Sequence, residues 1–143
     1  MLENRLTAAL FGDPETDAHL TDSAELAAMI RFEGALAEAE AAQGVIPKAA
    51  GPAIARALRS VEVSAPDLTT ATAAAGVPVP PLVEALRHRV GEPFGSFVHW
   101  GATSQDVVDT GWVIRISSIL ELFESRLRRL VETLADQAEE HAA

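Results

Sequence analysis

The chain has 143 residues, a length typical of one small domain or of part of a larger one. Its formal net charge is -10, from 11 basic and 21 acidic side chains, which argues against nucleic acid and anionic membranes as partners. The absence of cysteine argues against disulfides and thiolate metal sites. No apolar run is long enough to span a bilayer, and the N-terminus lacks a signal-peptide core. We therefore expect a soluble, cytoplasmic protein.

The apolar residues are mostly small. Hydrophobic residues make up 48% of the chain, yet only 5% of residues are aromatic and 27 are alanine. Alanine at this level favours tightly packed helices. There is no alternating run of strand length, so the sequence predicts an all-α fold.

The first predicted helix follows a turn-rich arm over residues 1–20, which we expect to lie over another part of the protein. Asp22 and Glu25 form a capping-box pattern, and apolar residues recur at helical spacing until Gly44 and Pro47. Glu33 falls on the apolar face of this helix. We expect Glu33 to be half-buried and paired with an arginine or a capped backbone group.

Shorter helices are predicted between residues 47 and 91. One follows Pro47, and a second begins at a cap over residues 64–67 and stops at Gly76. Prolines in the VPVPP run, residues 77–81, predict that the next helix begins only at Pro81 and ends at Gly91. The LRHR sequence around His88 has the pattern of a solvated helix face.

The last predicted helix begins at Ser104 and reaches His141. Thr103 and Ser104 offer N-cap hydroxyls, and Asp106 stands where a capping-box acid belongs. A helix of this length would be about 57 Å long, whereas a compact globule of this size is about 37 Å across. The helix must therefore project, and its apolar residues form a heptad seam that predicts self-association. The seam residues are Val113, Ile116, Leu120, Phe123, Leu127, Leu130 and Leu134.

The segment FVHWGATSQDVVDT, residues 97–110, carries the side chains best suited to chemistry. The N–H groups at the start of a helix bind anions, and here they lie beside the hydroxyls of Thr103 and Ser104. Gly101 would allow close approach of a ligand, and His99 could donate to a carboxylate or move a proton. A carboxylate substrate suits this segment. The same spacing also fits an ordinary helix cap, and Trp100 and Trp112 also fit packing anchors.

This segment resembles the first signature of the fumarase/aspartase superfamily, and HWGATSQDVVDT resembles the form found in the 3-carboxy-cis,cis-muconate cycloisomerase family. IRFEGALAEAEAAQGVIP, residues 30–47, and AAAGVPVPPLVEALRHRV, residues 73–90, are similar to upstream helices of the same family. The resemblance implies an N-terminal helical domain with a substrate loop over residues 1–103. Residues 104–143 would form the first long helix of the central bundle of a homotetramer.

The resemblance also implies the chemistry and the residues that carry it. A polycarboxylate would close to a lactone through an aci-carboxylate carbanion, without a cofactor or metal. His99 would be catalytic. Substrate would contact Gly101, Thr103, Ser104 and Gln105, with Asp106 and Trp100 in support.

Two later signature segments of the family, one with a histidine and one with a serine on a glycine-rich loop, have no match in this sequence. We therefore expect the chain to be the N-terminal portion of such an enzyme and to be inactive alone. Two alternatives stay open: another superfamily lyase, such as one like adenylosuccinate lyase, and a stand-alone helical interaction module.

Overall fold

The computed structural model describes residues 5–142, except for the side chains of residues 5, 6 and 8, and over that range it is all-α. No helix in the described range is long and apolar enough to cross a membrane. The elements are α1 (Arg5–Phe11), α2 (Pro14–Ala18), α3 (Asp22–Gln43), α4 (Ala50–Leu58), α5 (Ala65–Ala75), α6 (Val79–Val90), the 3-10 turn η1 (Gly95–Phe97) and α7 (Ser104–Glu140).

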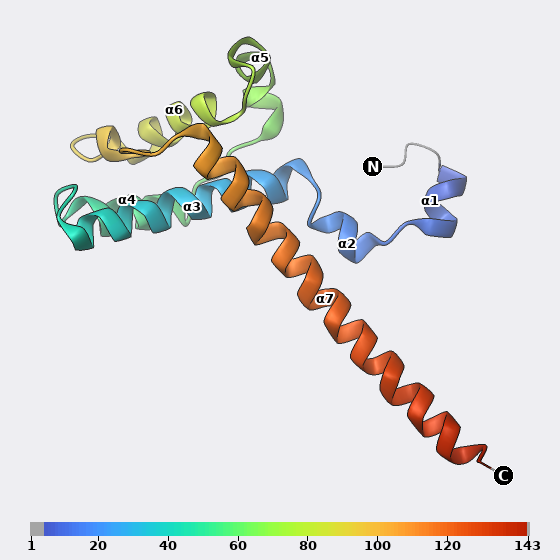
Figure 1. Cartoon of the computed structure of the whole chain (residues 1–143). Helices are drawn as coiled ribbons and strands as arrows, with labels where there is room; N and C mark the ends of the chain where they lie inside the picture. The colour runs from blue at the N-terminus through green and yellow to red at the C-terminus, as the bar shows by residue number, and fades with distance from the viewer. Residues whose placement is uncertain (1–4, 143) are drawn as a thin grey trace.

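The core lies where α3, α4 and α6 pack together beside the first turns of α7 (Figure 1). Small residues let α3 and α4 approach closely: a methyl group added at Gly51 of α4 would stand 2.6 Å from the Cβ of Ala41. The largest fully buried apolar side chains are Met29, Ile54, Val79, Leu82, Leu86, Val98 and Val107.

Helix α3 has the predicted length but a different cap. The hydroxyl of Thr21 accepts from the N–H of Ala24, so Thr21 is the N-cap and Asp22 is the first helical residue. The predicted capping box of Asp22 and Glu25 is therefore wrong by one position. Gly44 ends the helix in the left-handed conformation, with φ of 73°, as expected of a C-cap glycine.

Helices α4, α5 and α6 follow the predicted order, with one correction. Helix α6 begins at Val79 and not at Pro81, because Pro80 and Pro81 both occupy its first turn, where the missing N–H groups would have no helical acceptor. Gly76 and Gly91 end α5 and α6 as predicted.

The N-terminal arm is more helical than the sequence analysis predicted, because it contains α1 and α2. Arg126 of α7 binds the carboxylates of Asp13 and Glu15, and its Nη2 atom lies 2.9 Å from Oδ1 of Asp13. This pairing lowers the pKa of Asp13 well below its ordinary value and raises that of Arg126. The start of α2 is therefore held beside the middle of α7, whereas α1 lies away from that helix (Figure 1). Residues 1–4 are outside the described range.

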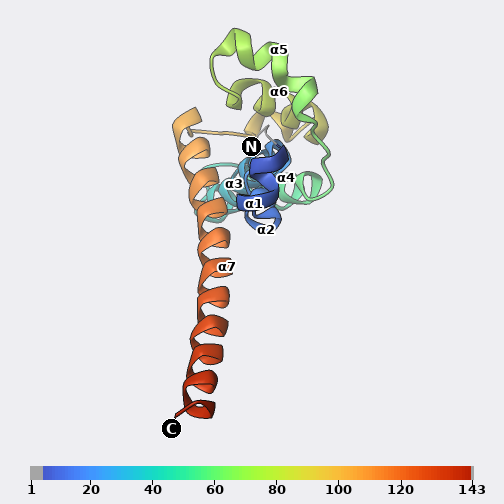
Figure 2. The ribbon, with the colours of Figure 1, turned by 90° about the vertical axis from the view of Figure 1, so that its right-hand side faces the viewer.

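Helix α7 is a projecting rod of 37 residues, as the sequence predicts (Figures 1 and 2). Its N-terminal turns pack on α3 at Gly111, next to Met29 and Ala28, while the guanidinium of buried Arg115 stacks over Trp112. Beyond this crossing, the other residues that the structure describes do not cover the seam. The seam residues Val113, Ile116, Leu120, Phe123, Leu127, Leu130 and Leu134 are each at least 41% exposed.

Candidate functional site

The segment between η1 and α7 is anchored at Val98 and then turns sharply. The Val98 side chain is buried, and its carbonyl accepts two hydrogen bonds from Arg87 of α6, from Nε at 3.2 Å and from Nη2 at 3.0 Å. His99 follows with φ of 62°, in the left-handed region that a non-glycine residue rarely adopts. Gly101, with φ of 70°, supplies a second left-handed position. The backbone thus turns the His99 ring inward.

The partner of His99 is Glu33 on α3. Nδ1 of His99 lies 2.7 Å from Oε1 of Glu33, and the side chain of Glu33 is 0% exposed against 15% for His99. Glu33 is paired, as expected, but it is fully buried and not half-buried, and its side-chain partner is His99 and not an arginine. The helical period placed Glu33 correctly on the inner face, but it carried no information about a residue 66 positions away.

Burial dominates the electrostatics beneath the loop. It raises the pKa of Glu33, although the hydrogen bond and charge of His99, and the charge of Arg87, act in the opposite direction. Burial also raises the pKa of Glu40, one oxygen of which lies near Gly101. Within the described range, Oε2 of Glu33 and Oε2 of Glu40 are buried without a hydrogen-bond partner. Two acidic groups therefore lie under the turn, and only one is paired with His99.

The predicted capping box at the start of α7 is confirmed. The Thr103 hydroxyl accepts from the N–H of Gln105 at 3.1 Å, and the Asp106 carboxylate accepts from the N–H of Thr103 at 2.9 Å. The N–H of Asp106 bonds to the carbonyl of Thr103. These bonds engage most of the donors that an anion would use. In the described part of the chain, the N–H and hydroxyl of Ser104 retain no partner.

A cavity of 480 Å³ brings three donors together: Arg87, His99 and Ser104 line it, opposite Val79 and Val83 of α6. Glu84 lines it as well and adds one negative charge. The LRHR sequence around His88 was expected to be a solvated helix face, and Arg87 was not predicted as a site residue. Arg87 could have been found from its position four residues after Val83, which places both side chains on the side of α6 that faces the loop.

The other predicted site residues lie around this cavity but do not line it. Trp100 is 47% exposed and packs against the ring of Phe97, with centroids 5.8 Å apart. Gln105 donates from Nε2 to Asp109 Oδ1 at 2.5 Å, so the structure engages its amide within α7.

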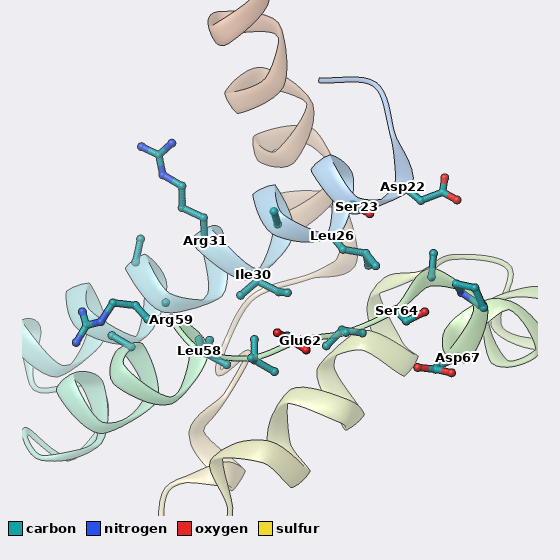
Figure 3. A pocket seen from close by; sticks show the side chains of 18 of the residues that line it. Asp22, Ser23, Leu26, Ile30, Arg31, Leu58, Arg59, Glu62, Ser64 and Asp67 are labelled. Carbon is teal, nitrogen blue, oxygen red and sulfur yellow. The ribbon is translucent and has the colours of Figure 1, made fainter. Parts of the chain in front are cut away.

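A larger cavity lies elsewhere in the described chain. It has a volume of 1020 Å³ and lies between α3, α4 and α5, where Leu26, Ile30 and Leu58 form its apolar wall (Figure 3). None of the predicted site residues lines it. Over the described residues, no group of three or more His, Asp or Glu side chains is arranged to hold a metal ion.

Comparison with known proteins points to one family. The family model described as "Lyase" matches residues 13–143. A 3-carboxy-cis,cis-muconate cycloisomerase of Pseudomonas aeruginosa is 42% identical over 97% of this chain and 31% of its own length. An adenylosuccinate lyase of Methanocaldococcus jannaschii is 32% identical over 92% of this chain and 28% of its own length.

The fold agrees with a solved structure of the same kind. The crystal structure of the 3-carboxy-cis,cis-muconate lactonizing enzyme from Pseudomonas putida superposes with a TM-score of 0.87 at 40% identity, over 97% of this chain and 32% of the other. The chain thus spans about a third of the length of the relatives it matches.

Proposed function

Because this chain belongs to the lyase family of the fumarase/aspartase superfamily, we propose that it supplies part of the active site of a 3-carboxy-cis,cis-muconate cycloisomerase. The observation that carries the proposal is the cavity lined by His99, Ser104 and Arg87, in the segment whose sequence resembles that family's signature. Higher identity to a cycloisomerase than to an adenylosuccinate lyase favours this substrate over the runner-up.

The donors around the cavity suit a carboxylate. The N-terminus of α7 carries about half a positive charge, and Ser104 offers both its N–H and its hydroxyl there. Arg87 adds a guanidinium, whose positive charge balances the negative charge of Glu84. We assign substrate contacts to His99, Gly101, Thr103, Ser104 and Gln105.

Asp106 and Trp100 take supporting roles. Asp106 holds the N–H of Thr103 and so keeps the first turn of α7 in shape. Trp100 packs on Phe97 and stabilises the loop from outside.

The proposed reaction is an isomerisation within one substrate molecule. A carboxylate oxygen of the substrate adds to a carbon of its diene, so that a ring C–O bond forms and an electron pair moves toward a neighbouring carboxylate. The resulting aci-carboxylate carbanion then takes up a proton at carbon. Oriented donors such as Ser104 and Arg87 would stabilise the charge that develops on the aci-carboxylate, and His99, once protonated at Nε2, would supply the proton that the carbon takes up. No cofactor enters this scheme.

We further propose that the chain acts as part of a larger assembly. Residues 1–103 would form the helical domain with the substrate loop, and residues 104–143 the first helix of a central bundle. The exposed seam of α7 would pack against copies of itself in a homotetramer located in the cytoplasm. Because the chain spans a third of its relatives, we expect it to be inactive alone.

Two assays test this function. The product of the complete open reading frame is given carboxymuconate or adenylosuccinate, and we expect turnover of the first alone. Changing Thr103→Ala together with Ser104→Ala should lower kcat/KM at least about tenfold, since one charge-assisted hydrogen bond contributes about 1.5 kcal/mol. Turnover of adenylosuccinate, or an unaffected double variant, would contradict the proposal.

Light scattering after size exclusion tests the assembly. We expect the chain to self-associate at micromolar concentration and Leu120→Glu with Leu127→Glu to abolish association, because both changes place charges in the seam. Arg129→Glu is the control, since Arg129 is exposed on the same helix but does not line the groove formed by Leu120, Phe123 and Leu127. A monomeric wild-type chain with intact α7 helicity would contradict the proposed assembly.

A further inference from the structure

Glu33 is placed to control the chemistry of His99 without reaching the cavity itself. Its carboxylate is buried beneath the loop, and Oε1 lies 2.7 Å from Nδ1 of His99. Glu33 is not among the residues that line the cavity, whereas His99 is. Any effect of Glu33 on a bound ligand must therefore pass through the imidazole.

The imidazole is held from two directions. The backbone of His99 is in the left-handed region, and the carbonyl of Val98 just before it accepts two hydrogen bonds from Arg87. Its side chain is held by Glu33, which comes from a different helix. Because Nδ1 is turned toward a fully buried carboxylate, the ring edge that carries Nε2 is the edge left for the cavity.

The second oxygen of Glu33 also indicates that this carboxylate serves to hold the His99 ring. Oε2 is buried, and in the described part of the chain it has no hydrogen-bond partner. An acid that served packing alone would have both oxygens satisfied in most proteins. Here His99 is the single hydrogen-bond partner of the carboxylate within the described range.

We propose that Glu33 is a positioning residue that fixes the tautomer of His99, so that Nδ1 carries the proton and Nε2 presents its lone pair to the substrate. The hydrogen bond from His99 and the positive charge of Arg87 favour the ionised form of Glu33. An ionised carboxylate can only accept hydrogen bonds, so in this arrangement Nδ1 donates to it. The neutral ring then has its unprotonated nitrogen on the cavity side, where it can accept a proton or, once protonated, donate one. The inference rests on the proposed function only for the role of His99 toward substrate.

The tautomer can be measured on the 143-residue chain without any ligand. The ¹⁵N chemical shifts of the His99 ring distinguish a protonated from an unprotonated nitrogen. In the wild-type chain we expect the neutral ring to be protonated at Nδ1. Glu33→Met should move the population toward protonation at Nε2, because methionine offers no oxygen acceptor to Nδ1. Glu33→Gln, whose amide oxygen can still accept from Nδ1, should keep much of the wild-type tautomer.

Glu38→Gln is the matched control, since Glu38 lies on the same helix but is exposed and makes no contact with His99. We expect this variant to leave the His99 shifts unchanged. Circular dichroism verifies that each variant keeps its helices; if Glu33→Met does not fold, Glu33→Leu, which also lacks an acceptor, decides. A wild-type ring protonated at Nε2, or a folded Glu33→Met or Glu33→Leu variant with unchanged tautomer, would overturn the inference.

Kinetics on the product of the complete open reading frame separate this inference from the proposed function. Glu33→Met should lower kcat/KM at least about tenfold, and adding His99→Gln should lower it little further, because both changes disable the same group. A tautomer that shifts while kcat/KM stays constant would refute the role of His99 toward substrate and leave its control by Glu33 intact. An unshifted tautomer refutes the control by Glu33 alone.

Discussion

Two glycines, Gly111 and Gly51, offer a test of the helix packing, because the same substitution should have opposite effects at the two sites. Alanine in place of glycine favours a helix by up to about 1 kcal/mol. At Gly111 on α7, the added Cβ would lie 3.6 Å from Cγ of Met29 and 3.8 Å from Cβ of Ala28, which are ordinary contacts. Burying this methyl group adds less than about 1 kcal/mol. We expect Gly111→Ala to raise the free energy of unfolding by about 1 kcal/mol.

At Gly51 on α4 the methyl group has no room. It would stand 2.6 Å from Cβ of Ala41 and 2.7 Å from the carbonyl oxygen of Ala37, so α3 and α4 would have to separate until these contacts reach at least 3.4 Å. Overpacking of this kind costs about 1 to 3 kcal/mol and exceeds the helical gain. We expect Gly51→Ala to lower the free energy of unfolding by about 1 to 2 kcal/mol.

Urea unfolding followed by circular dichroism and tryptophan fluorescence measures both effects. The two variants should shift the midpoint in opposite directions with an unchanged slope. Protein concentration must be held constant, because association through the seam would make stability depend on it. A Gly51→Ala variant as stable as the wild type would refute the close approach of α3 and α4, and a destabilised Gly111→Ala would refute the crossing of α3 and α7.

Three further changes test other parts of the structure. Thr103→Ala removes the cap of α7 and should destabilise the chain by about 1 kcal/mol in urea unfolding, whereas Ser104→Ala, which removes no capping bond, should have little effect. Burial raises the pKa of Glu40 above its ordinary value of 4.5, so protonated Glu40 contributes stability that is fully present below pH 4.5 and is lost as pH rises through the raised pKa. Glu40→Gln should therefore stabilise the chain at neutral pH and change its stability little in acid. An effect of the same size at both pH values would contradict this. Arg126→Ala breaks the contacts with Asp13 and should speed hydrogen exchange in α2 relative to α4; equal rates in variant and wild type would show that the arm is held by other contacts.

Local patterns in the sequence predicted the helices well. The capping box at Thr103 and Asp106 and the glycine stops depend on residues a few positions apart, so the sequence contains all the information they need. The seam was predictable for the same reason, since its period lies within one helix. The N-cap of α3 was predicted one residue too late, because both Thr21 and Asp22 have side chains that can cap a helix.

The candidate site was only half predictable. The loop residues stand together in the sequence, and their spacing at a helix start indicated an anion site. Glu33 and Arg87 reach the loop from two other helices, through contacts that depend on how α3 and α6 pack. No periodicity within one element encodes such a contact.

Helix α7 extends far beyond its crossing with α3 at Gly111. About 29 residues, or about 44 Å of helix, follow this crossing, so a tilt of about 5° there would displace the C-terminal end of α7 by about 4 Å. Small residues at this crossing, Gly111 and Ala28, therefore set the direction in which the distant apolar seam points. A substitution that leaves the helices intact would still displace the far end of the seam, and in the homotetramer that we propose it would misalign the packing there.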